Sequence, residues 1–162
     1  MKVLVSVSSR HGSAKEIGDT IAQTLKERGL DVHQGVPQDI DSIADYDALV
    51  LGSAVYMTQW MEEMLNFISV FSLQLRKKPL WAFSVGLAGV PKGSLQDPSR
   101  VGPALLSISP REHKLFSGKL DSAQLNMRER TIAKLGGAAE GDFRQFDEVK
   151  TWANRIADNL LK

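Results

Sequence analysis

The sequence predicts an α/β fold in which a parallel β-sheet carries helices on both faces. Three observations predict it. Short apolar runs of strand length alternate with longer segments whose apolar residues recur every three or four positions. The strongest strand candidates end in turns of small or polar residues. The 162 residues, 43% hydrophobic and 24% charged, suffice for one domain with a sizeable core.

Five segments have the length and composition of buried strands. Residues 3–7 are the clearest, because β-branched side chains dominate the run and a polar turn follows it. Residues 48–51 and 80–85 are strong apolar runs, while residues 30–32 and 114–116 are weaker ones. Continuous apolar runs of this length are typical of strands that are covered on both faces, as in a parallel sheet.

Helical periodicity fills the segments between these strands. Apolar residues from 14 to 25 share one face, and Gly29 ends that helix. Residues 60–71, 122–135 and 149–160 repeat the pattern. Strands that alternate with helices imply βαβ units, and therefore a sheet whose strands run parallel.

One long connection departs from this alternation. Four of the six prolines lie between Val90 and Pro110. This segment is therefore predicted to be a loop, with a short helical turn at residues 104–108. The chain has no internal repeat and no low-complexity tract, so residues 1–162 are predicted to form one domain.

Composition excludes several classes of function. The chain has no cysteine, which rules out disulfides, iron–sulfur clusters, thiolate zinc sites and cysteine nucleophiles. Its three histidines, His11, His33 and His113, lie far apart in the sequence, so no metal site is predicted. The net charge of +1 argues against a dedicated nucleic-acid binder.

Hydropathy and charge predict a cytoplasmic protein. The longest uncharged apolar stretch, residues 64–75, is too short to cross a bilayer, and no export signal is recognised. Residues 1–75 carry five basic and ten acidic side chains, whereas residues 76–162 carry fifteen and nine. This asymmetry has two interpretations, an ordinary solvated surface or a basic face that contacts a membrane peripherally.

Three turns are expected to meet at one edge of the sheet, because ligands bind beyond the carboxyl ends of parallel strands. The turns are residues 8–13, 52–56 and 84–89. In the first, Ser9, Ser13 and the backbone N–H groups at a helix start suit a phosphate, although a plain helix cap explains them equally well. The three-glycine dinucleotide fingerprint and the Walker A lysine motif are both absent.

The other two turns suit a flat ligand. In the second turn Tyr56 is predicted to stack on a planar ring, whereas Trp60 is predicted to belong to the core. The third turn presents backbone donors and acceptors to the edge of a heterocycle. A phosphate site beside two walls of small residues describes a phosphorylated, flat cofactor with a polar edge, and FMN fits that description.

The first turn resembles the phosphate loop of flavodoxins. Residues 50–56, 115–121 and 140–144 are similar to the short flavodoxin-domain proteins that include menaquinone-dependent protoporphyrinogen oxidase. The resemblance spans essentially the whole chain. It implies a three-layer flavodoxin-like fold, with a five-stranded parallel sheet in the order 2-1-3-4-5, and FMN as the cofactor.

Residues of the three turns are predicted to bind FMN, and none is assigned as catalytic. Flavodoxins usually have Thr where this chain has His11 and Ala14, so two hydroxyl donors are missing. Carrier flavodoxins are strongly acidic, whereas this chain is near neutral, which favours an enzyme. The predicted FMN-binding residues are Ser9, Arg10, His11, Gly12, Ser13, Ala14, Ser53, Ala54, Val55, Tyr56, Ser84, Val85, Gly86, Leu87 and Gly89.

Three functions remain open. The leading one is an FMN-dependent oxidoreductase: the resemblance implies a porphyrinogen substrate, a quinone acceptor and a place in haem biosynthesis. Residues 90–110 and 122–135 are its predicted entrance, where Arg128, Arg130 and Lys134 meet porphyrin propionates or lipid headgroups. The alternative is a flavodoxin-type electron carrier with a redox partner protein. The third is a flavin-free interaction module.

Overall fold

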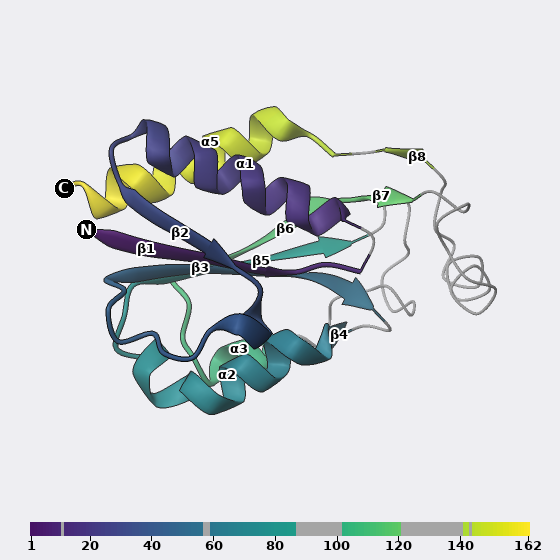
Figure 1. Ribbon diagram of the computed structural model, residues 1–162. Helices are drawn as coiled ribbons and strands as arrows, with labels where there is room; N and C mark the ends of the chain where they lie inside the picture. The colour runs from purple at the N-terminus through teal and green to yellow at the C-terminus, as the bar shows by residue number, and fades with distance from the viewer. Residues whose placement is uncertain (11, 57–58, 87–101, 121–140, 143) are drawn as a thin grey trace.

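Five parallel strands form the central sheet of the computed structural model (Figure 1). The structure describes residues 1–10, 12–56, 59–86, 102–120, 141–142 and 144–162. The sheet order is β2-β1-β3-β5-β6, and the two-residue strand β4 pairs antiparallel with β3. Counting the parallel strands alone, the predicted order 2-1-3-4-5 is confirmed. The strands are β1 (Lys2–Ser8), β2 (Asp31–Gly35), β3 (Ala48–Tyr56), β4 (Gln59–Trp60), β5 (Leu80–Gly86) and β6 (Glu112–Ser117), and β7 (Lys119–Leu120) pairs antiparallel with β8 (Gly141–Asp142).

Helices cover both faces of the sheet, which confirms the three-layer prediction (Figure 1). On one face lie α1 (Ser13–Glu27) and α5 (Phe146–Leu160), and on the other α2 (Glu62–Leu75) and the short α3 (Gly102–Leu106). A 3-10 turn, η1 (Pro37–Asp39), follows β2. Both chain ends lie at one end of the sheet, opposite to the carboxyl ends of β3 and β5.

Alternating side chains divide the core into two clusters. In β1, Val3 and Val5 pack with α1 and α5, whereas Leu4 packs with α2. All three are at most 1% exposed. Successive strand residues point to opposite faces, so a strand covered on both faces is apolar along its whole length. This is the physical basis of the continuous apolar runs seen in the sequence.

The region after β3 differs from the prediction. Residues 52–56 are not a turn but the second half of β3, which runs to Tyr56. Trp60 is 2% exposed and belongs to the core as predicted, although it lies in β4 and precedes the helix. Met61 is the N-cap of α2. Hydrogen bonding to β5 and β4 extends the strand beyond its apolar run, which periodicity alone does not reveal.

The connections agree with the prediction where the structure describes them. The helical turn expected at residues 104–108 is α3 (Gly102–Leu106). Residues 87–101 and the helix predicted at 122–135 lie outside the described residues. In the described part of the chain, no helix combines the length and the apolar character that a membrane span requires.

The missing side chain at Gly52 makes room for the aromatic ring of Phe83. A Cβ built on Gly52 would lie 2.0 Å from Cζ of Phe83, which is fully buried on the neighbouring strand. The Phe83 ring also meets the rings of Phe116 and Trp152, each at a centroid distance of 6.0 Å. Because Trp152 belongs to α5, this cluster joins the sheet to its covering helix.

We therefore expect Gly52→Ala to lower the free energy of unfolding by about 1–3 kcal/mol, since the new methyl group displaces the Phe83 ring. Urea unfolding measures this. The matched control is Gly102→Ala, where a Cβ meets nothing within 4 Å. Equal stability of the two variants would contradict this account of Gly52.

Candidate functional site

Three serines stand level with one another on neighbouring strands. Ser8 of β1 pairs in register with Ser53 of β3, which pairs with Ser84 of β5. Their side chains share the α2 face, since Leu4 and Leu49 point there and strand residues alternate. All three serines are at most 5% exposed. The strand ends that carry the predicted turns are thus aligned, as expected.

The first turn leaves the start of α1 open. Gly12 is the N-cap, in the left-handed region with φ of +85°, and α1 has no side-chain capping hydrogen bond. The N–H of Gly12 donates to Ser9 Oγ over 3.0 Å, which closes the turn. A Cβ on Gly12 would meet nothing within 4 Å among the described residues. A helix N-terminus without a side-chain cap suits an anion, because its N–H groups carry positive partial charge.

The first and third turns lie against each other. The N–H of Gly118, just after β6, donates to the Gly86 carbonyl over 2.7 Å. A Cβ on Gly118 would lie 2.9 Å from that oxygen and 3.4 Å from Ser13 Oγ. Three segments therefore meet around Gly118: the start of α1, the start of the third turn and the end of β6. We call this meeting point the rim site.

Arg144 brings a cation with a largely buried side chain to the first turn of α1. Its side chain is 7% exposed, forms an ion pair with Glu16 in the first turn of α1, and lies 5.0 Å from the centroid of the Phe146 ring. Sequence reasoning used Arg144 only within a family motif and assigned it no role. The pairing was not foreseeable, because 128 residues separate the partners.

The Ser53 side chain holds the start of α2 through a hydrogen bond. Its hydroxyl accepts a hydrogen bond from the N–H of Met61 over 2.9 Å and donates to the Ala54 carbonyl over 2.9 Å. Because the hydroxyl makes both bonds within the protein, the backbone of Ser53 is the part left to contact a ligand.

Ser84 is the centre of a buried hydrogen-bond chain. Trp60 Nε1 donates to Ser84 Oγ over 2.7 Å, and Ser84 Oγ is 2.7 Å from His113 Nε2. Because the indole N–H can only donate, Ser84 Oγ keeps its own hydrogen and a second lone pair for His113. It donates to Nε2 when the ring hydrogen is on Nδ1, and it accepts when Nε2 carries a hydrogen. Desolvation of the ring by burial lowers the pKa of His113 below its ordinary 6.5, which favours the neutral ring.

Several other predicted residues are placed as follows. The side chains of Ala14, Val55 and Val85 are at most 6% exposed, which leaves their backbone groups for a ligand, whereas Arg10 is exposed. The backbone of Tyr56 pairs with Gln59. Three residues lie outside the described residues: His11, Leu87 and Gly89.

Two buried hydroxyls beside the rim have no partner among the described residues. They belong to Ser6 and Ser8, which are 0% and 5% exposed. A buried hydroxyl without a hydrogen bond is costly, so each calls for a water molecule or a ligand group. Ser8 is the last residue of β1 and lies directly before the first turn. In the described residues, no three His, Asp or Glu side chains are placed to hold a metal ion.

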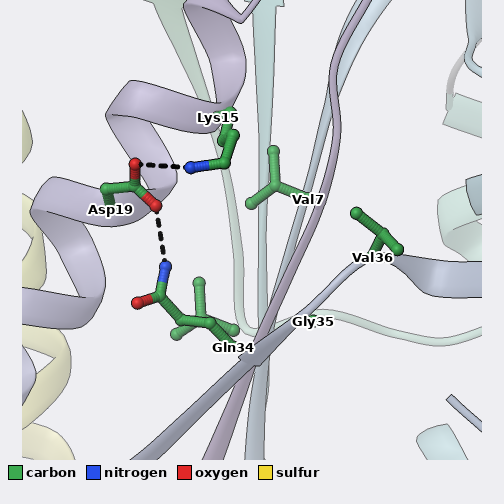
Figure 2. A pocket seen from close by; sticks show the side chains of 7 residues that line it. Val7, Lys15, Asp19, Gln34, Gly35 and Val36 are labelled. Atoms are coloured by element: carbon green, nitrogen blue, oxygen red, sulfur yellow. Dashed lines mark hydrogen bonds and ion pairs between the residues drawn. The ribbon is translucent and has the colours of Figure 1, made fainter. Parts of the chain in front are cut away.

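A separate pocket lies between α1 and the edge strand β2 (Figure 2). Its volume is about 290 Å³. Asp19 accepts bonds from Lys15 Nζ over 3.0 Å and from Gln34 Nε2 over 2.9 Å, so its carboxylate is neutralised and fully engaged. Valines and a glycine complete the lining. The polar groups of this pocket bind one another, which makes the rim site the stronger candidate.

Known proteins share this fold. A family model described as a flavodoxin domain matches residues 4–145. None of the curated proteins matches the sequence.

Solved structures resemble the chain over its whole length. A flavodoxin from the domain Archaea has a TM-score of 0.65 at 16% identity, with 100% of both chains covered. Oxidised Flavodoxin 1 from Bacillus cereus has a TM-score of 0.66 at 13% identity, with 98% of each chain covered. Rubredoxin oxygen:oxidoreductase from Desulfovibrio gigas has a TM-score of 0.66 at 15% identity, but this chain spans only 36% of its length. Such low identities establish the fold alone.

We expect the stability of the protein to fall as pH is lowered below about 6.5, because unfolded His113 binds a proton that the folded ring resists. The loss continues until the pH passes the lowered pKa of the folded state. His113→Gln keeps an acceptor for Ser84 without a titratable group, so its free energy of unfolding should change less between about pH 8 and pH 5. Urea unfolding measures both profiles, and parallel profiles would contradict the assignment.

Proposed function

This chain belongs to the flavodoxin domain family, and we propose that it binds FMN at the rim site and works as an electron carrier. One observation carries the proposal. Among the described residues, the start of α1 follows the left-handed Gly12 without a side-chain cap, at the carboxyl end of a parallel sheet. This is where α/β folds of this kind bind phosphorylated ligands. The similarity to flavodoxins over 98% or more of both chains supports the carrier reading.

The residues of the first turn fit a phosphate group. Ser9 Oγ already accepts the N–H of Gly12, so its own hydrogen is available to donate to a phosphate oxygen. The N–H groups at the start of α1 add further donors. Arg144 holds positive charge beside Glu16, close to the same helix start.

The walls of the rim site fit a flavin. Gly86 and Gly118 keep side chains away from the point where β5 and β6 end. Ser8, whose buried hydroxyl has no partner among the described residues, is the last residue of β1 and directly precedes the first turn in the chain. When bound, FMN supplies one- and two-electron chemistry, and the protein holds it, orients it and sets its electrostatic surroundings.

A second candidate function is the quinone-dependent oxidation of a porphyrinogen, as in haem biosynthesis. Its support is the sequence resemblance at residues 115–121 and 140–144, together with the near-neutral charge of the chain. The predicted turns contain no Asp or Glu, unlike those of acidic carriers. The candidate implies a quinone as acceptor and contact with a membrane surface through the basic C-terminal half. A third possibility, a flavin-free interaction module, is an outcome of the tests below.

We expect the purified protein to bind FMN in a 1:1 ratio, and Gly12→Ala to weaken that binding at least tenfold. The new methyl group enters the space in front of the first turn. Gly29→Ala is a matched control, since Gly29 has φ of +89°, meets nothing within 4 Å and lies at the other end of α1. Each variant bears a backbone strain of about 1–3 kcal/mol.

Fluorescence titration with FMN measures the affinity of the Gly12→Ala and Gly29→Ala variants for the cofactor. Equal affinity of the two variants would show that the phosphate does not lie at Gly12. If the wild-type protein does not bind added FMN, the flavin-free interaction module is the function that remains.

The two flavin functions differ in what reoxidises the reduced protein. A carrier passes electrons rapidly to an acceptor protein and oxidises no porphyrinogen. We therefore expect the photoreduced, FMN-loaded protein to reduce cytochrome c and to show no oxidation of protoporphyrinogen with a menaquinone analogue above the rate of free FMN. Porphyrinogen oxidation well above that rate would establish the second candidate instead.

A further inference from the structure

The outer face of α2 carries apolar side chains that nothing in the described structure covers. Val70 and Leu73 are 73% and 72% exposed, whereas Met64, Ile68 and Leu75 of the same helix are buried in the core. Val70 and Leu73 are three residues apart, so they are neighbours on the helix surface. Two adjoining apolar groups on one helix stripe form the start of a contact surface.

Opposite charges stand at the two ends of this stripe. Glu63 lies in the first turn of α2, and Lys77 follows its last turn. Both are exposed, and neither has an ion-pair partner within the described part of the chain. Fourteen residues of helix separate them by roughly 21 Å, so they cannot pair with each other.

The spacing of these groups is symmetric about Val70. Glu63 precedes Val70 by seven residues and Lys77 follows it by seven, and seven residues are close to two helical turns. A helix with this pattern is complementary to itself in the antiparallel direction. With a twofold axis at Val70, Glu63 of each copy meets Lys77 of the other.

We propose that two copies of this chain pair antiparallel through the outer faces of α2. The two Val70 side chains meet on the axis, each Leu73 lies one turn away, and two Glu63–Lys77 ion pairs close the ends. Such an interface is isologous, since both copies contribute the same surface. Antiparallel helices also set their dipoles in the favourable orientation.

Self-association accounts for the charge pattern better than other occupants do. An anionic membrane surface selects basic residues throughout, whereas this stripe begins with Glu62 and Glu63. The basic end is only partly free, because Arg76 Nε donates to the Ser107 carbonyl over 2.6 Å. A surface with acidic residues at one end, basic residues at the other and an apolar centre between them matches its own copy in the antiparallel direction.

The pairing leaves both rim sites open. Met61, the N-cap of α2, is bound to Ser53 near the carboxyl end of β3, so α2 begins at the end of the sheet that carries the rim site. A twofold axis through the middle of α2 turns the two rim sites in opposite directions. The inference therefore does not depend on whether FMN binds.

Sedimentation equilibrium over a range of protein concentrations tests the proposal, at about 0.05 M salt to limit screening. We expect a reversible dimer. Lys77→Glu and Glu63→Lys should each weaken it about tenfold, because each reversal turns two attractions into repulsions. The double variant Glu63→Lys/Lys77→Glu should regain the wild-type affinity, which a change in folding cannot do.

Substitutions of exposed apolar residues supply the second test. Val70→Asp should abolish the dimer, because it places two carboxylates on the axis. Leu161→Asp is the matched control: Leu161 is 50% exposed just after α5, on the opposite face of the sheet, and the dimer should persist. A monomer at every concentration, or a dimer insensitive to Val70→Asp, would overturn the proposal. A monomer that binds anionic vesicles, and loses that binding in Val70→Asp, would overturn it in favour of a lipid surface.

Discussion

The burial of both faces of a parallel sheet is the constraint on which the rest of this structure depends. Each of β1, β3 and β5 must supply apolar side chains to two helical layers at once. The space between layers is limited, and the contact of Phe83 with the backbone of Gly52 shows how closely it is filled. Through Phe83 the same cluster reaches Trp152 and holds α5 on the sheet.

Among the described residues, the buried polar side chains of this sheet lie toward the carboxyl ends of its strands. Ser8, Ser53 and Ser84 lie level there, on the face toward α2. The Ser53 hydroxyl is hydrogen-bonded to Met61, and the Ser84 hydroxyl is hydrogen-bonded to Trp60 and His113. Ser8 alone of the three has no partner among the described residues. Side-chain hydrogen bonds of the sheet thus hold the segments that frame the rim site.

Function in this fold resides in a small part of the molecule. The rim site needs a glycine with positive φ, an open helix start and two strands that end together, and these features are compatible with very different sequences. Relatives at 13–16% identity therefore share the fold almost completely. For the same reason the fold does not choose between carrying electrons and oxidising a substrate, because that choice lies in the surroundings of the cofactor.

The sequence by itself determined the layers, the parallel direction of the strands and the first turn, since apolar periodicity and a glycine at a helix start are local signals. It also placed Trp60 in the core. The order of the strands was implied by the resemblance to flavodoxins. Only the tertiary structure decided that residues 52–56 continue β3, that Arg144 pairs with Glu16, and that Ser84 joins Trp60 to His113. The physical reason is that these contacts join segments that are distant in the chain. The pairing of parallel strands brings these segments together, but it produces no periodic pattern in the sequence of any one segment.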